Sequence, residues 1–159
     1  NFIYALRDIK VIAWTTLVFA IILYIADKNR FDKKISTNLN IQKIFFIGLF
    51  QVLSLVPGVS RAGITITAAR ILKFNRVDSS KISFLLSIPA LLGASVLSLK
   101  DILEQSIQFN YLVVIAIISS FIFSFLTVKF FLIYINKFSM NAFVIYRIII
   151  ALILFSLIY

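Results

Sequence analysis

Runs of apolar residues long enough to cross a lipid bilayer follow one another along this sequence. About 20 such residues, at about 1.5 Å of helix rise each, cross the hydrocarbon core. Inside that core only helices and closed barrels satisfy their backbone hydrogen bonds, and the runs lack the alternation of barrel strands. The sequence therefore predicts an all-α integral membrane protein, a polytopic helix bundle in one transmembrane domain. Its apolar segments lie at about 11–26, 44–72, 82–99, 111–135 and 143–159.

Composition excludes several kinds of chemistry. Hydrophobic residues make up 62% of the chain and charged residues 14%, whereas soluble domains carry about 25% charged residues. There is no cysteine and no histidine, which removes thiol nucleophiles, disulfides and the commonest base and metal ligand. All the carboxylates lie in predicted loops or at segment ends, two of them in a loop expected at 100–104, so we expect no metal site and no membrane-embedded base in this chain. They are Asp8, Asp27, Asp32, Asp78, Asp101 and Glu104.

The charge is strongly basic, with 16 Lys and Arg against 6 Asp and Glu, a net charge of +10. In so apolar a chain this indicates cytoplasmic loops that obey the positive-inside rule and contact anionic membrane lipids. Nucleic-acid binding would need a basic face on a soluble module. The sequence contains no such module, so we expect no nucleic-acid partner.

The segment 44–72 is interrupted by the stretch LVPGVSRAGITI at 55–66. It is either one broken span or a re-entrant hairpin with half-helices at 44–56 and 64–72, each too short to cross alone. The hairpin keeps Lys43 and the group Lys73, Arg76 and Lys81 on one side, so the positive-inside bias favours it. A broken helix remains an alternative wherever protein or water satisfies its backbone.

The interruption has the geometry of an anion site. Pro57 removes a backbone donor and ends the first half-helix. Gly58 and Gly63 allow backbone conformations and close approaches that a side chain prevents. The second half-helix is expected to begin near Gly63 or Ile64, and its first N–H groups and positive dipole end favour an anion.

Polar side chains beside the break complete a predicted phosphate-binding site. Ser60 adds a hydroxyl, Thr65 a second one, and Arg61 a planar guanidinium suited to phosphate oxygens. Such groups at depth in a bilayer are usually functional, although Pro-Gly breaks, serine caps and snorkelling arginines also occur for structural reasons. Gln51 and Ser54, one turn apart on the first half-helix, either adjoin the site or only satisfy the hairpin backbone.

Three further features have structural interpretations. Arg147, early in the last span, either snorkels to the interface or reaches an internal partner, and we interpret it as structural. Lys129 is expected to snorkel. Small residues at helical spacing predict a close-packing face. They are Ala90, Gly93, Ala94 and Ser98.

Two linked motifs resemble those of the bacterial undecaprenyl-diphosphatases, the bacitracin-resistance type. QVLSLVPGVSRAGITI at 51–66 and SFLLSIPALLGA at 83–94 resemble the family's Pro-Gly-x-Ser-Arg-Ser-Gly-x-Thr and Ser-Phe-Leu-Leu-x-Ile-Pro signatures, and FVIYRIIIALIL at 143–154 resembles its closing Tyr-Arg helix. The resemblance covers the chain from about Ile12 onward. The matching residues are Pro57, Gly58, Ser60, Arg61, Gly63 and Thr65, then Ser83, Phe84, Leu85, Leu86, Ile88 and Pro89, and finally Tyr146 and Arg147.

The resemblance implies a hydrolase of the bacterial inner membrane that removes the terminal phosphate of undecaprenyl diphosphate, a lipid carrier of peptidoglycan synthesis, and confers bacitracin resistance. It implies an active site that includes Ser60 and Arg61, and a fold of two inverted halves, each with a re-entrant hairpin. It also implies a divalent cation, magnesium or calcium. The family's glutamates and histidine are absent here, and Ala62 replaces a serine. We therefore expect this chain to be a C-terminal portion that is inactive alone, with the missing N-terminal half of the protein as its partner. Homo-oligomerisation is also possible.

Other functions fit parts of the same pattern. Half-helices that point their N-termini at an anionic substrate are also found in transporters, so a transporter or flippase for an anionic or prenyl-phosphate lipid is the alternative. An inactive membrane-packing subunit is a third possibility. Within the hydrolase interpretation, Ser60 is either a hydrogen-bond donor or a nucleophile, with a weak preference for the former.

Overall fold

The computed structural model describes residues 7–104 and 111–158, and in those ranges the chain forms helices and no strand. Four helices are long and apolar enough to cross a membrane, which confirms an all-α, multi-pass membrane protein. The elements are α2 (Ile9–Asp27), α3 (Ile35–Asn38), α4 (Ile41–Val52), the 3₁₀ turn η1 (Leu53–Leu55), α5 (Arg61–Ile71), α6 (Arg76–Glu104), α7 (Tyr111–Lys137) and α8 (Asn141–Ile158).

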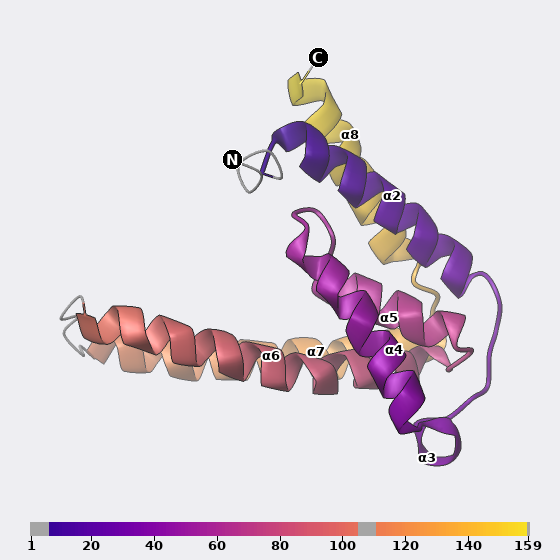
Figure 1. Cartoon of the computed structure of the whole chain (residues 1–159), viewed down its shortest axis with the longest axis horizontal. Coiled ribbons are helices and arrows are strands. Elements are labelled where there is room, and N and C mark those ends of the chain that lie inside the picture. Colours follow the sequence, from indigo (N-terminus) through magenta and orange to yellow (C-terminus); the bar gives the residue numbers. More distant parts are fainter. Residues whose placement is uncertain (1–6, 105–110, 159) are drawn as a thin grey trace.

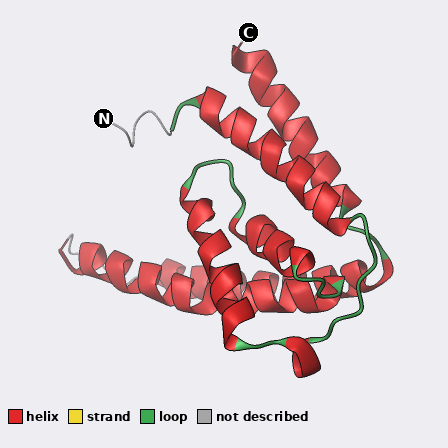
Figure 2. Cartoon of the chain, turned by 45° about the vertical axis from the view of Figure 1, so that its right-hand side comes forward, coloured by secondary structure: helices red, strands yellow, loops and turns green. Residues whose placement is uncertain are grey.

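Two helix pairs frame the molecule (Figure 1). Helices α2 and α8 pack side by side and antiparallel, and α6 and α7 form a second long pair that points away from the first. The shorter helices α4 and α5 lie where the two pairs meet, and the turned view in Figure 2 shows the same arrangement. Helix α5 packs against both pairs, and α4 packs against α5.

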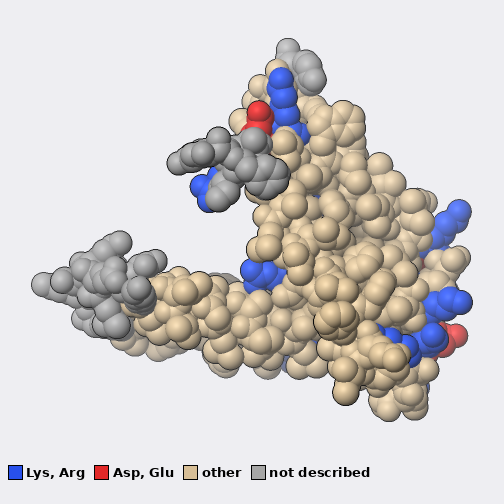
Figure 3. Space-filling view, viewed as in Figure 1, with Lys and Arg blue, Asp and Glu red and all other residues tan. Residues whose placement is uncertain are grey.

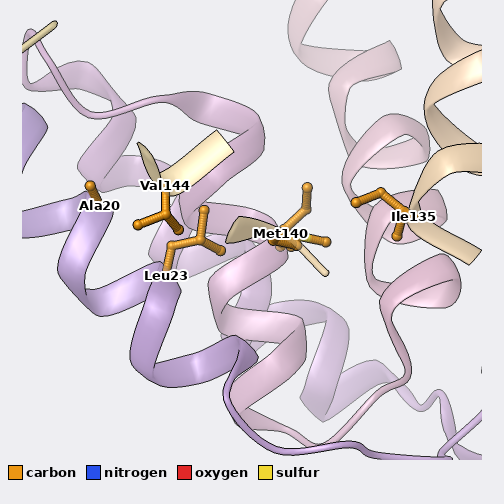
Figure 4. Packing of buried hydrophobic residues seen from close by; sticks show 6 residues of the cluster. Ala20, Leu23, Ile135, Met140 and Val144 are labelled. Atoms are coloured by element: carbon orange, nitrogen blue, oxygen red, sulfur yellow. The ribbon is translucent and has the colours of Figure 1, made fainter. Parts of the chain in front are cut away.

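Helix α5 is the centre of the packing, since every residue from Ile64 to Arg70 is buried. One apolar cluster joins α5 to α2, α7 and α8 (Figure 4), and a second joins it to α4 and α6. Burial on all sides fixes the position of the α5 N-terminus, where the interrupted motif lies. The first cluster contains Ala20, Leu23, Ile66, Ile135, Met140 and Val144, and the second Ile47, Ala68, Ala69, Phe74 and Ile82.

Helices α4 and α5 form a hairpin rather than one broken span. The Lys43 ammonium, near the start of α4, lies 5.7 Å from the ring centroid of Phe74, just beyond the end of α5. The two ends of the interrupted segment therefore lie close together. That the basic residues at both ends share one side of the membrane stays a prediction, as does the depth of the hairpin in the bilayer.

Several boundaries differ from the sequence-based expectation: α4 begins at Ile41 rather than 44, and α6 at Arg76 rather than 82. Two further differences bear on the site and on the length of α6. Helix α5 begins at Arg61, three residues before the expected Ile64, because the Ser60 side chain caps it. Helix α6 continues to Glu104, so the loop expected at 100–104 is wrong. The loop was inferred from the end of the apolar run, but charged residues such as Lys and Glu propagate a helix well.

The predicted small-residue face of α6 has no neighbour in the described part of the chain. Gly93 and Ala94 are exposed, and a Cβ added to Gly93 would meet no atom within 4 Å. Small residues permit a close helix approach, but here the α6–α7 pair uses other positions, so this expected packing face is not formed within these residues.

A buried ion cluster ties the helix ends together. The Asp27 carboxylate is 2% exposed and lies 3.1 Å from Nε of Arg70 and 2.8 Å from Nε of Arg76. The backbone N–H of Met140 donates to the same carboxylate at 3.1 Å. One side chain thus joins the end of α2, the end of α5, the start of α6 and the turn before α8.

Candidate phosphate-binding site at the hairpin tip

The N-terminus of α5 presents backbone donors to the hairpin tip. Ser60 Oγ accepts a hydrogen bond from the N–H of Gly63 at 3.1 Å, which is an N-cap. The N–H groups of Arg61 and Ala62 have no hydrogen-bond partner among the residues described. Two orphan donors and the positive end of an 11-residue helix therefore face the tip.

Arg61 lines a cavity of mixed polar and apolar character at this terminus. Its side chain is exposed and forms no hydrogen bond or ion pair with any described residue. The cavity has a volume of about 410 Å³, and the hydroxyl-bearing residues Ser54, Ser83 and Ser87 line it together with Arg61. A free guanidinium beside three serines is suited to phosphate oxygens.

Ser60 lines a second, mainly apolar cavity of about 540 Å³. Gly58, Gly63 and Arg147 line its polar end, and Leu23, Ile66, Phe131, Met140, Phe143 and Ile150 line the remainder. Val59 and Ala62 border both cavities. Ser60 and Arg61 therefore line different cavities, and the Ser60 cavity is the more apolar of the two.

The loop that carries Gly58 is fastened to α2. Gly58 has a φ of +89°, and a Cβ there would lie 2.1 Å from Oγ1 of Thr15 and 2.7 Å from the carbonyl oxygen of Ile12. The Thr15 hydroxyl donates to the Pro57 carbonyl at 2.7 Å, and that of Thr16 to the Gly58 carbonyl at 3.4 Å. Only glycine fits this contact.

Arg147 fastens the same loop to α8. Its Nη2 donates to the Gly58 carbonyl at 2.8 Å, and the side chain is buried. A Cβ on Gly63 would come within 3.0 Å of its Nη1, so the glycine makes room for the guanidinium. Of the two roles considered for Arg147, the structure shows the internal partner rather than snorkelling.

The sequence matches a known protein family. The family model described as bacitracin resistance protein BacA matches residues 2–153. The chain belongs to the BacA family. Proteins named undecaprenyl-diphosphatase from Pelagibacter ubique, Elusimicrobium minutum and Alcanivorax borkumensis are 70%, 47% and 42% identical to it over 96%, 89% and 91% of its length.

The chain spans 60%, 54% and 55% of these three BacA-family relatives, respectively. The match to the family model and the identity to these relatives confirm the resemblance seen in the interrupted motif and the SFLL segment.

Two of the predicted site residues occupy other environments. Thr65 is buried, and its hydroxyl contacts Oγ of Ser83 at 2.6 Å and the carbonyl of Arg61 at 2.9 Å, so it ties α5 to α6. A contact between Thr65 and phosphate stays a prediction. Ser54 lines the Arg61 cavity, whereas Oε1 of Gln51 is buried without a hydrogen-bond partner in the described ranges.

The residues described do not fit a divalent cation. No group of three or more His, Cys, Asp or Glu side chains lies close enough to hold a metal within 7–104 and 111–158. The hairpin tip offers Arg61 and Arg147 but no carboxylate, and magnesium and calcium prefer carboxylate and carbonyl oxygens. No step of the chemistry is therefore assigned to a metal in this chain.

Arg147 has the structural role expected for it, whereas Thr15, Thr16 and Ser87 were not predicted to contact the site. Arg147 carried a usable signal, because a charged residue within an apolar BacA-family helix needs a specific partner. The two threonines carried none, since threonine is common in membrane helices, where its hydroxyl can bond a preceding carbonyl. Their contacts with 57–58 join residues 42 positions apart.

Replacing Arg147 by methionine in the full-length protein is expected to lower the free energy of unfolding by about 1.5–3 kcal/mol, because a charge-assisted hydrogen bond to Gly58 is lost. The thermal midpoint in detergent, followed by circular dichroism, measures the effect. Lys129→Gln, at an exposed position of α7, is the control and should change stability by less than about 0.5 kcal/mol. Equal midpoints for the two variants would refute the fastening role.

Proposed function

We propose that the full-length protein hydrolyses undecaprenyl diphosphate to undecaprenyl phosphate and phosphate in the bacterial inner membrane. The observation that carries this proposal is the unpaired Arg61 guanidinium at the capped N-terminus of α5. The relatives named undecaprenyl-diphosphatase support the same activity. Recycling of this lipid carrier would account for the family's bacitracin resistance.

Arg61 and the α5 N-terminus bind the diphosphate in this proposal. The charge that develops on the transferred phosphoryl group lies on its oxygens, and preorganised donors stabilise it. Arg61 supplies a fork of N–H donors, and the backbone N–H groups of Arg61 and Ala62 supply two more. These groups need not reorganise, since α5 is buried and held on all sides.

Ser60 acts as a hydrogen-bond donor rather than a nucleophile. Its Oγ already accepts the Gly63 N–H, which leaves its O–H free to donate to a phosphate oxygen. The attacking nucleophile is then a water molecule, activated by a base from the rest of the protein. Among the residues described, no carboxylate lines either cavity at the tip.

The apolar cavity on the Ser60 side accommodates the first part of the prenyl chain. Its lining is aliphatic and aromatic, and its polar end lies at Ser60 and Arg147. A diphosphate at the α5 N-terminus would direct its lipid tail along this cavity. The polar and apolar halves of the substrate thus match the two sides of the Ser-Arg pair.

The general base and any divalent cation belong, in this proposal, to residues of the full-length protein outside this sequence. The relatives matched are longer than the chain. Carboxylates contributed by that additional length would complete the site opposite Arg61. The remaining part of the protein is thus proposed as the partner of the hairpin tip.

Arg61→Ala in the full-length protein tests the proposal. Because Arg61 makes no contact with described residues that the fold requires, the thermal midpoint should stay unchanged while phosphate release from undecaprenyl diphosphate falls by about 10²–10³-fold. The rate of phosphate release by Arg61→Lys, which keeps the charge and loses the planar fork, should lie between the rates of the wild type and Arg61→Ala. Near-normal turnover of Arg61→Ala would refute the assignment.

The comparisons do not favour the transporter or flippase alternative, because the relatives are named as diphosphatases. The two activities separate in reconstituted vesicles that contain the lipid substrate. Hydrolysis releases phosphate, whereas transport moves the intact lipid to the other leaflet without releasing phosphate. Movement of intact undecaprenyl diphosphate with no phosphate released would support the alternative.

A further inference from the structure

A second polar cavity lies at the other end of α5, away from the hairpin tip. Its volume is about 540 Å³, and it is bordered by the loop after α2, the end of α5, the start of α6 and the end of α7. Since α5 has 11 residues, its two ends are separated by roughly 15 Å of helix rise. This cavity is therefore distinct from the candidate phosphate site.

Cations dominate the lining of this cavity. Five basic side chains border it, against the two carboxylates Asp32 and Asp78, and the buried Asp27 lies beneath them. Even with all three carboxylates ionised, two positive charges remain in excess. The five basic residues are Arg30, Lys34, Arg70, Arg76 and Lys137.

Three of these cations are free to bind a ligand. Arg70 and Arg76 pair with Asp27. The side chains of Arg30, Lys34 and Lys137 are exposed and have no hydrogen-bond or ionic partner within the described part of the chain. Of the carboxylates, Asp78 accepts the backbone N–H of Ile35 at 3.0 Å and so is already engaged.

The cavity also lies at the level where lipid headgroups are expected. It adjoins the ends of the candidate spans α2 and α7 and the start of α6. Basic side chains gather at this end of the molecule in Figure 3, beside the loop that follows α2. Next to it, α7 exposes apolar side chains such as Ile133 and Phe130 along its length. Basic pockets between membrane helices on the cytoplasmic side bind anionic headgroups.

We propose that this cavity binds a phosphate-bearing anion, either the headgroup of an anionic phospholipid or free phosphate. Arg30, Lys34 and Lys137 contact the phosphate oxygens, and the Asp27–Arg70–Arg76 cluster forms the rigid floor. A phospholipid would place its acyl chains on the exposed apolar face of α7. The proposal is independent of the activity at the hairpin tip.

Thermal shift titrations of the full-length protein in detergent test the proposal. The probes are a short-chain phosphatidylglycerol, the matching phosphatidylcholine and sodium phosphate, all at constant ionic strength. An Arg61→Ala background reduces phosphate binding at the tip. The variant Lys34→Gln/Lys137→Gln should bind the anionic probe roughly 25-fold more weakly, about fivefold for each cation removed.

Lys28→Gln/Lys81→Gln is the matched control, because it removes the same charge from exposed positions outside the cavity lining. Its affinity should equal that of the parent. Stabilisation by phosphatidylglycerol alone identifies the headgroup as the ligand, and stabilisation by phosphate alone identifies the free anion. Binding of neither probe, binding equally strong to phosphatidylcholine, or equal losses in the two double variants would overturn the proposal.

Discussion

Asp27→Ala is expected to lower the free energy of unfolding of the full-length protein by about 3–5 kcal/mol, because it leaves the charge of Arg70 buried without its partner. Arg70 is 1% exposed and Asp27 2% exposed, so water cannot replace the lost carboxylate. The Met140 N–H would also lose its acceptor. A fall in the thermal midpoint on the order of 10 °C would report this loss.

Asp32→Asn is the control for this experiment. Asp32 is an exposed carboxylate in the loop that follows α2 and makes no ion pair with any described residue. Its loss should change stability by less than about 0.5 kcal/mol. A midpoint for Asp27→Ala that equals that of Asp32→Asn would contradict the structural role of the cluster.

A double-mutant cycle separates the ion pair from simple loss of packing. Asp27→Ala and Arg70→Ala remove the two partners, and residues in direct contact are expected to couple by about 0.5–3 kcal/mol. The double variant should therefore be less destabilised than the sum of the two single variants. Strict additivity would mean that the two side chains stabilise the protein independently.

Gly58→Ala is expected to lower the free energy of unfolding by about 2–4 kcal/mol and to reduce phosphate release by about 10²-fold. A φ of +89° costs an L-residue about 1–2 kcal/mol. The new methyl group would also overlap the Thr15 hydroxyl and the Ile12 carbonyl. Relief of that overlap moves the loop that positions Ser60 and Arg61, and displacements near 1 Å can cost about 10²-fold in rate.

Gly48→Ala is the control for the backbone argument. Gly48 lies inside α4, and a Cβ added there would meet no atom within 4 Å. Alanine in a helix interior stabilises by roughly 0.5–1 kcal/mol relative to glycine. Gly58→Ala is therefore expected to lower the free energy of unfolding, and Gly48→Ala to raise it. Wild-type stability and turnover for Gly58→Ala would show that the α2 contact does not position the loop.

The hairpin tip illustrates why part of the site could be predicted. Pro57, Gly58, Ser60 and Arg61 are consecutive or nearly so, and their effects on a helix end are local. Proline ends a helix wherever it occurs inside one, and a serine before a helix caps it. The motif therefore predicted a helix N-terminus with a serine and an arginine beside it. Helix α5 begins at Arg61, two to three residues before the expected Gly63 or Ile64, because the Ser60 side chain caps the helix earlier.

Contacts between distant residues were not predictable in the same way. Arg147 reaches the Gly58 carbonyl across 89 positions, and Asp27 meets Met140 across 113. Apolar runs specify that helices form, but membrane helices do not associate through the hydrophobic effect, so their pairing depends on side-chain packing and hydrogen bonds. Which residues make these contacts is therefore decided by which helices pack against each other.

The sequence by itself determined the helical, membrane-spanning class through its composition, and a helix N-terminus beside Ser60 and Arg61 through short-range chain geometry. The family followed from the resemblance of its motifs. Only the tertiary structure decided that Arg61 and Ser60 border different cavities, that Thr65 bonds Ser83, and that Arg147 supports the loop. Which way a side chain points relative to another helix depends on helix rotation and packing. Neither quantity is encoded in the local pattern of residues.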